Sequence, residues 1–211
     1  GFILARSNLQ PVTRNISTSS GRDMLAVHPD ANKTFEELIA ALQESHALRI
    51  SAQKYLPFFP DFPKRKNEVK VVSAGFIYAD SQTGRMGLIA AGNYELSAAA
   101  GARCAEQNAL GLLQHYDIAP SQIKFIVGAS HSIADRADPK PLALGPCSVC
   151  QDHLRGLLKS TPCLSDAQIY VATPGMEGVK TSVGELVGIV HRGDLRHSAT
   201  EDQVNKKRRL E

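Results

Sequence analysis

The chain lacks long apolar runs and a strong excess of either charge. No stretch approaches the roughly 18 consecutive apolar residues that a membrane-spanning helix needs. The net charge is only +3, and much of the excess lies in the basic residues 206–209. These totals exclude a membrane span and do not imply a basic groove for nucleic acid.

Cysteine is also scarce, with four residues in a chain of 211. Two of the four lie in the segment Pro146-Cys147-Ser-Val-Cys150. Few cysteines at this spacing fit metal binding in a reducing compartment better than a disulfide framework. A hydrophobic content of 43% and a charged content of 21% are ordinary for a soluble globular protein. The length suits one domain with appendages.

Composition divides the chain into four segments. Residues 1–33 are predicted to be a leader, 34–68 an N-terminal helix with an aromatic loop, 69–190 the main domain, and 191–211 a basic tail. The leader carries Arg6, Arg14 and Arg22 and no acidic residue before Asp23. This pattern is typical of a mitochondrial presequence, and a flexible leader is the alternative. We expect a cytoplasmic protein, with the mitochondrion as the second location.

Hydrophobic periodicity predicts an alternation of strands and helices. Thr34 and Glu37 form a capping box at the start of the first helix. Residues 92–95 and 131–144 are predicted to be loops. The order of elements predicts a three-layer α/β/α fold with a mixed sheet. The predicted helices span 34–56, 103–115, a segment starting at 146, and 181–190; the predicted strands span 69–78, 86–91, 124–129 and 168–172.

Three cysteines and one glutamate are the components of a hydrolytic zinc site. Cys104 and Glu106 fall in the first turn of a predicted helix, where free N–H groups and the helix dipole stabilise a thiolate. Cys147 and Cys150 are one turn apart at the start of another helix. Three thiolates leave one tetrahedral position of Zn²⁺ for water, and a neighbouring carboxylate can move its protons. Cys-x-Glu followed by Pro-Cys-x-x-Cys matches the signature of zinc deaminases.

Simpler interpretations of these residues stay open. The zinc could be structural, with Cys163 or His153 as a fourth ligand. Glu106 could be a first-turn acid favoured by the helix dipole. His131 could be a surface histidine or could reach the pocket.

With Gly92-Asn93-Tyr-Glu95 and Cys104-Ala105-Glu106 preceding the Pro-Cys-x-x-Cys segment, residues 69–190 resemble the small zinc-dependent cytidine deaminases of the three-cysteine type. The resemblance implies that Cys104, Cys147 and Cys150 bind Zn²⁺ and that Glu106 is the catalytic proton shuttle. It implies that Asn93 and Glu95 bind the sugar hydroxyls and that the Ala105 backbone orients the base. On residue type alone, Asn93 is equally a turn residue and Glu95 a solvated acid.

The resemblance implies hydrolytic deamination of a small-molecule nucleoside, converting cytidine or deoxycytidine to uridine or deoxyuridine plus ammonia. It also implies a homodimer or homotetramer and a role in pyrimidine salvage. Family members that act on polynucleotides usually carry histidine in place of Cys104, so a nucleic-acid substrate is not favoured.

The chain departs from this family at three places. Lys70 stands where the family has a phenylalanine that stacks on the base, with Phe58 or Phe59 as replacements. Gln107 stands where arginine follows Cys-Ala-Glu, with Arg103 as the replacement, and Gln151 follows Cys150. These departures keep three alternatives open: an aminonucleoside antibiotic as substrate, a base within a polynucleotide, or a catalytically silent zinc protein.

Overall fold

A seven-stranded mixed sheet is the centre of the computed structural model, which describes residues 24–52, 68–97, 101–134 and 138–191. The strand order is β1-β3-β2-β6-β8-β9, and β7 pairs with β6. Only β6 and β8 run parallel among the pairs of this sheet within the described ranges. The strands are β1 Met24–Val27, β2 Glu68–Ala79, β3 Met86–Gly92, β6 Ile123–Ala134, β7 Lys140–Leu142, β8 Gln168–Val171 and β9 Gly178–Ser182.

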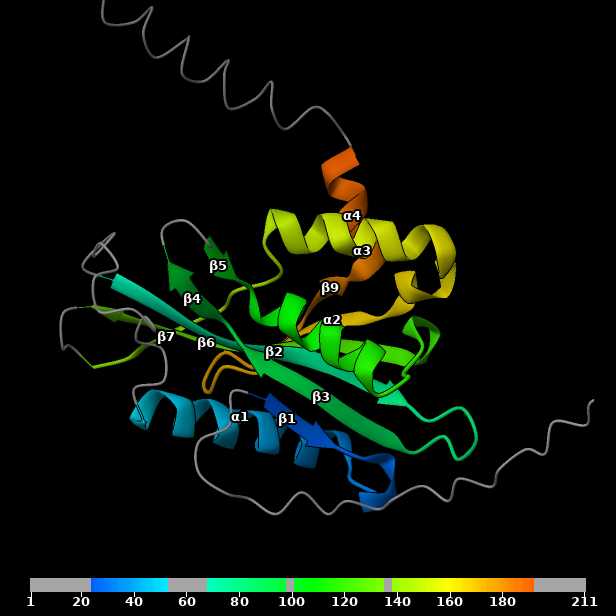
Figure 1. The fold of residues 1–211 in the computed structure, drawn as a ribbon, viewed down its shortest axis with the longest axis horizontal. Helices are drawn as coiled ribbons and strands as arrows, with labels where there is room; N and C mark the ends of the chain where they lie inside the picture. Colours follow the sequence, from blue (N-terminus) through cyan, green and yellow to red (C-terminus); the bar gives the residue numbers. More distant parts are fainter. Residues whose placement is uncertain (1–23, 53–67, 98–100, 135–137, 192–211) are drawn as a thin grey trace, which may run out of the picture.

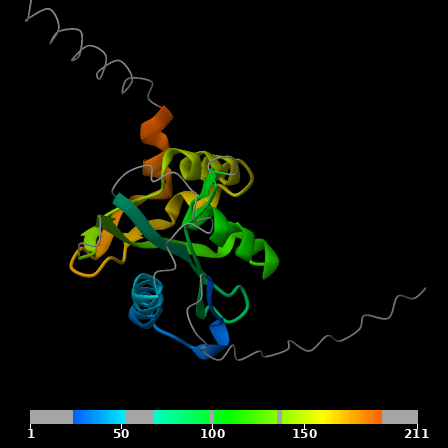
Figure 2. The same ribbon diagram turned by 60° about the vertical axis from the view of Figure 1, so that its left-hand side comes forward.

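Four α-helices cover the two faces of this sheet. α1 (Phe35–Ser51) lies on one face, while α2 (Ala105–His115), α3 (Ser148–Ser160) and α4 (Val183–His191) lie on the other (Figures 1 and 2). The predicted α/β/α layering with a mixed sheet is therefore confirmed. In the described part of the chain, no helix combines the length and apolar content needed to cross a bilayer.

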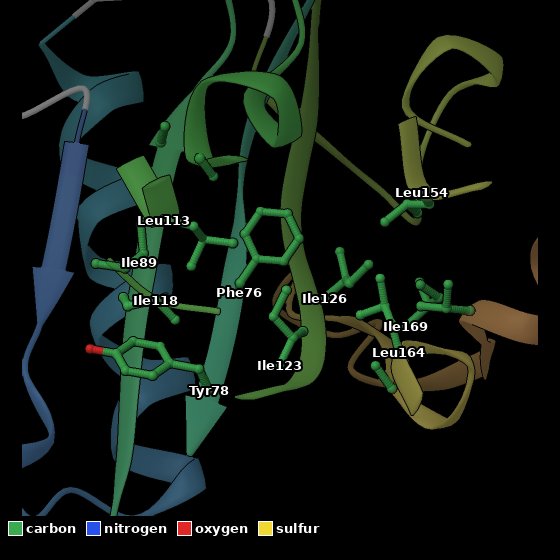
Figure 3. Close-up of a cluster of buried hydrophobic side chains, with 14 of the residues drawn as sticks. Phe76, Tyr78, Ile89, Leu113, Ile118, Ile123, Ile126, Leu154, Leu164 and Ile169 are labelled. Carbon is green, nitrogen blue, oxygen red and sulfur yellow. The ribbon is translucent and has the colours of Figure 1, made fainter. Parts of the chain in front are cut away.

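Alternation along the strands gives each face its own core. Phe76 and Tyr78 of β2 point toward α2, and Ile77 points toward α1. Figure 3 shows Phe76, Ile126 and Ile169 gathered in the cluster on the α2 face. Because successive side chains in a strand point to opposite faces, one continuous apolar strand supplies both cores.

The predicted hairpin of residues 69–78 and 86–91 is confirmed as the pair β2 and β3. Its turn is held by Asp80, whose Oδ1 accepts hydrogen bonds from the backbone N–H groups of Gln82 and Thr83. Gly84 has a positive φ of 69°, which glycine adopts without steric cost. The turn residues and the apolar pattern of the two strands therefore indicate the same hairpin.

Three local predictions are wrong. Residues 131–144 are not a long loop, because β6 continues to Ala134 and β7 pairs with it. Residues 92–95 are not wholly a loop, because β4 (Tyr94–Ser97) pairs with β5 (Gly101–Arg103) in a small separate sheet. The last helix begins at Val183, because Thr181 belongs to β9. In addition, β1 places part of the predicted leader at the edge of the main sheet.

Two polar side chains of α1 lie on its buried face. His46 and Arg49 are each only 2% exposed and continue the stripe formed by Leu38, Ile39 and Leu42. Hydrogen bonds join His46 Nδ1 to Ser73 Oγ (2.9 Å) and His46 Nε2 to His131 Nδ1 (2.9 Å). Burial, with the charges of His131 and Arg49, lowers the pKa of His46 to about 4.

We expect His46 to make the fold acid-sensitive. Between about pH 6.5 and about pH 4, His46 is protonated in the unfolded state but stays neutral in the folded state. The free energy of unfolding therefore falls as the pH falls through this window. A shift of this size corresponds to about 3 kcal/mol. Denaturant unfolding of the wild type and His46→Gln at a series of pH values measures it. Equal pH slopes for the two proteins in this window would contradict the prediction.

Candidate functional site

The first turns of α2 and α3 bring the three predicted zinc ligands together. Cys104 is the N-cap of α2 and Cys147 is the N-cap of α3, so both thiols lie where backbone N–H groups lack helical partners. Gln107 Oε1 accepts a hydrogen bond from the Cys104 backbone N–H (3.2 Å), and Gln151 Nε2 donates to the Pro146 carbonyl (2.9 Å). Both glutamines that depart from the family pattern thus hold the start of a cysteine-bearing helix.

The three sulfur atoms fit one tetrahedral metal ion. Cys104 Sγ is 3.4 Å from Cys147 Sγ, which is 3.5 Å from Cys150 Sγ, and all three atoms lie within 4.8 Å of one another. Zn–S bonds of about 2.3 Å at tetrahedral angles would separate two sulfurs by about 3.8 Å. The cysteines therefore form a possible zinc site, and within the described ranges no fourth protein ligand joins the cluster.

Crowding of acidic groups also favours a cation at this cluster. Burial, together with the neighbouring thiol and carboxyl groups, raises the pKa of Cys104 to about 11 and raises that of Cys150 as well. Burial opposes ionisation of Cys147 too, but hydrogen bonds from the backbone of Cys150 and from neighbouring groups lower its pKa. A divalent cation is the partner that makes several anionic ligands tolerable in one small volume.

Glu106 lies beside the cluster in the first turn of α2. Its Oε2 is 3.6 Å from Cys150 Sγ, and burial raises the pKa of its carboxyl group. Ala105, the residue before Glu106, is fully buried. Both residues line the pocket described below. The roles of Glu106 as proton shuttle and of the Ala105 backbone in orienting the base stay predictions.

Asn93 lines the same pocket, but its amide is already bonded to β2. The Asn93 Oδ1 accepts a hydrogen bond from the Val72 N–H (2.9 Å), and its Nδ2 donates to the Lys70 carbonyl (2.9 Å). Glu95 lies in β4 opposite Ala102, and its side chain falls outside the described part of the structure. The sugar-binding roles of Asn93 and Glu95 stay predictions.

A pocket of about 740 Å³, including its open mouth, adjoins the cysteines. Its floor is the sheet, with Ala74, Ile126 and Gly128, and the segment Leu144, Gly145 and Pro146 forms another part of its lining. Arg103, an exposed residue at the end of β5, also lines it.

Two buried hydroxyl groups hold the chain that leads to Cys147. Ser130 Oγ donates to the Leu142 carbonyl (2.8 Å), and Thr173 Oγ1 donates to the same oxygen (2.7 Å). The Leu144 N–H donates to Ser130 Oγ (3.4 Å). These hydrogen bonds were not predicted from the sequence. Their signal was a hydroxyl residue directly after each of two apolar segments, Ser130 after 124–129 and Thr173 after 168–172.

Other candidates do not join the site. Cys163 is exposed, and neither it nor His153 belongs to the metal-capable cluster. His131 lies in β6, bonded to His46, and is not among the residues that line the pocket. Lys70 is exposed in β2. Phe58 and Phe59, the predicted stacking residues, lie outside the described residues.

Comparisons with known proteins give structural likenesses only. No family model and no curated protein sequence matches the chain. A cytidine deaminase from Burkholderia pseudomallei is 17% identical with a TM-score of 0.44, over 73% of this chain and 96% of that one. A cytidine deaminase from Mycobacterium leprae is 20% identical with a TM-score of 0.38, over 73% and 97% of the two chains. At these values the likeness carries no argument about reaction or substrate, which must be inferred from the site itself.

Proposed function

We propose that this protein is a zinc-dependent hydrolase that deaminates a cytidine-type free nucleoside or a close analogue. The observation that carries the proposal is the position of Glu106, a half-buried carboxyl group 3.6 Å from Cys150 Sγ in a three-cysteine cluster that opens into a pocket. A structural zinc site needs four protein ligands and no acid beside them. Three thiols plus an adjacent carboxyl group suit hydrolysis of an aminopyrimidine.

The chain's own residues supply binding and proton transfer. Zinc, when bound by Cys104, Cys147 and Cys150, would supply Lewis acidity that makes water a nucleophile near neutral pH. Glu106 Oε2 would accept a proton from the attacking water and deliver it to the ring nitrogen next to the amino-bearing carbon. It would then take the proton of the newly added hydroxyl group and pass it to the amino group, whose C–N bond breaks as ammonia leaves. The sheet floor and the segment 144–146 would exclude water from the base, and the net reaction consumes water and releases ammonia.

A nucleoside panel tests the proposal. Purified zinc-loaded protein is assayed for ammonia release from cytidine, deoxycytidine, an aminonucleoside antibiotic and a single-stranded oligonucleotide. We expect turnover of cytidine or deoxycytidine. Release from the antibiotic or the oligonucleotide alone would replace the proposed substrate class. Ammonia release from none of them, by protein with full zinc content, would favour a catalytically silent zinc protein.

We expect Gly128→Val to impair substrate binding without loss of zinc. A Cβ atom at Gly128 would meet only Ser73 O and Ala74 Cβ, each at 3.9 Å, so the sheet tolerates a side chain that enters the pocket. Filling a packed or occupied space costs typically ~1–3 kcal/mol, which corresponds to roughly 5- to 150-fold in KM.

Steady-state kinetics and zinc content of this variant are measured beside Gly128→Ala and Gly111→Ala. Gly111 lies on α2, and apart from the adjoining backbone of its own helix no described atom lies within 4 Å of its added Cβ, so it serves as the matched control. We expect Gly128→Ala to have an intermediate KM and Gly111→Ala to match the wild type. An unchanged KM for Gly128→Val would show that substrate does not occupy this floor.

A further inference from the structure

The buried guanidinium group of Arg49 lies behind Asn93, a residue that lines the pocket. It leaves α1 three residues after His46 and is 2% exposed. Its Nη1 donates to the Val72 carbonyl (2.8 Å) and to Asn93 Oδ1 (3.2 Å), and its Nη2 donates to the Asn93 carbonyl. One guanidinium group therefore binds β2 and both oxygens of Asn93. The planar fork of arginine suits such a multiple contact, and lysine lacks it.

Glycine at position 92 makes room for this guanidinium group. A Cβ atom there would lie 2.3 Å from Arg49 Cζ and 2.3 Å from Arg49 Nε, which is a clash. From the opposite face, Asn108 Nδ2 of α2 donates to the Gly92 carbonyl (2.8 Å). The end of β3 is thus held between α1 and α2, and α2 is the helix that carries Glu106.

These hydrogen bonds determine which donor or acceptor groups of the Asn93 amide remain for a ligand. An amide oxygen has two lone pairs, and those of Asn93 Oδ1 face the Val72 N–H and Arg49. An amide nitrogen has two N–H groups, and one of Asn93's donates to the Lys70 carbonyl. The other has no partner among the described residues. Asn93 can therefore present a hydrogen-bond donor to the pocket but not an acceptor.

We propose that Arg49 is a positioning residue for substrate binding: from behind the sheet it fixes Asn93 so that one amide N–H meets an oxygen of the substrate's sugar. This inference rests on the proposed function, which places a nucleoside in the pocket. It assigns to α1, which contributes no residue to the pocket lining, a part in substrate affinity. Arg49 has no direct contact with the reacting atoms, so it acts on binding and not on proton transfer.

Two kinds of measurement test the proposal. The first is steady-state kinetics with cytidine for Arg49→Ala, Arg49→Lys and Gly92→Ala. The second is calorimetric binding of cytidine to the same variants in a Glu106→Gln background, where turnover is removed. Because small displacements of binding groups cost up to about 100-fold, we expect KM and Kd to rise roughly 10- to 100-fold, with kcat within about threefold and zinc content unchanged. Millimolar guanidinium chloride should partly restore the KM of Arg49→Ala.

His46→Gln is the matched control. His46 lies on the same helix, is equally buried and contacts Ser73 and His131 in place of Asn93. We expect it to keep the wild-type KM whatever its effect on stability. The proposal is overturned if the Arg49 variants keep the wild-type KM and Kd, if His46→Gln raises KM equally, or if guanidinium restores nothing.

The outcomes separate this inference from the proposed function. An active wild type whose KM does not depend on Arg49 removes only the inference. An inactive wild type, with Arg49-dependent binding of cytidine in the Glu106→Gln background, removes only the proposed reaction. An inactive wild type, together with failure of the Glu106→Gln protein to bind cytidine at all, would remove both.

Discussion

Glu106→Gln is expected to reduce kcat for ammonia release by roughly 10³-fold, which is within the range of about 10²–10⁴ for a positioned acid–base group. Glutamine keeps the shape of the side chain and a hydrogen-bonding oxygen, but it cannot carry the proton from water to the base. The position of Glu106, with its Oε2 at 3.6 Å from Cys150 Sγ, means that the substitution removes the acid beside the cysteines and leaves the three sulfurs in place. Zinc content and the Kd for cytidine should therefore stay close to those of the wild type.

Glu185→Gln is the control for loss of a carboxylate. Glu185 lies in the first turn of α4, where its Oε2 accepts hydrogen bonds from Thr181 and from the Ser182 N–H, so it is another helix-start acid away from the pocket. It should keep wild-type kcat. If Glu106→Gln retains more than about a tenth of the wild-type kcat, the proton shuttle is another group. If it loses zinc, the carboxylate is a ligand.

Sequence pattern was sufficient for the strands and helices with strong periodicity. β2, β3, α2 and α3 each have long apolar or capped segments, and each was predicted within a few residues. The short edge elements were missed, because four-residue β1 has too few positions to show alternation. β7 contains Pro141, and proline within a run argues against a strand unless that strand lies at an edge.

Some residues of the candidate site could likewise be predicted from the sequence, and others could not. The cysteines and Glu106 stand in two short motifs, 104–106 and 146–150, so sequence alone indicated them, and the structure brings them together. Arg49 and His46 were missed although they continue the apolar stripe of α1 at Leu42, three and four residues apart. Polar residues on an apolar stripe are a usable signal, because burial of such groups requires partners. The sequence pattern could not identify the partners of Arg49 and His46, because β2 and β6 are separated from α1 in the sequence.

Cys150→Ala is expected to abolish zinc binding and to destabilise the protein strongly. Cys150 is 2% exposed, and its sulfur lies next to Cys147 Sγ and Glu106 Oε2, so it joins the first turns of α2 and α3. Two remaining thiols cannot complete the metal site. A ligand present at about 1,000 times its Kd stabilises a fold by about 4 kcal/mol. For a chain of this length, loss of that stabilisation lowers Tm by roughly 10 °C.

Zinc content by elemental analysis and Tm by calorimetry, each before and after treatment with a chelator, measure the effect. Cys163→Ala is the matched control, because Cys163 is exposed and lies outside the metal-capable cluster. The chelator should lower the Tm of the wild type and of Cys163→Ala toward that of Cys150→Ala, and it should leave Cys150→Ala unchanged. Full zinc in Cys150→Ala, or loss of zinc in Cys163→Ala, would show that the metal is bound by a different set of residues. In that case the half-buried carboxyl group of Glu106 would lie beside ordinary thiols, and the basis for hydrolysis would be lost.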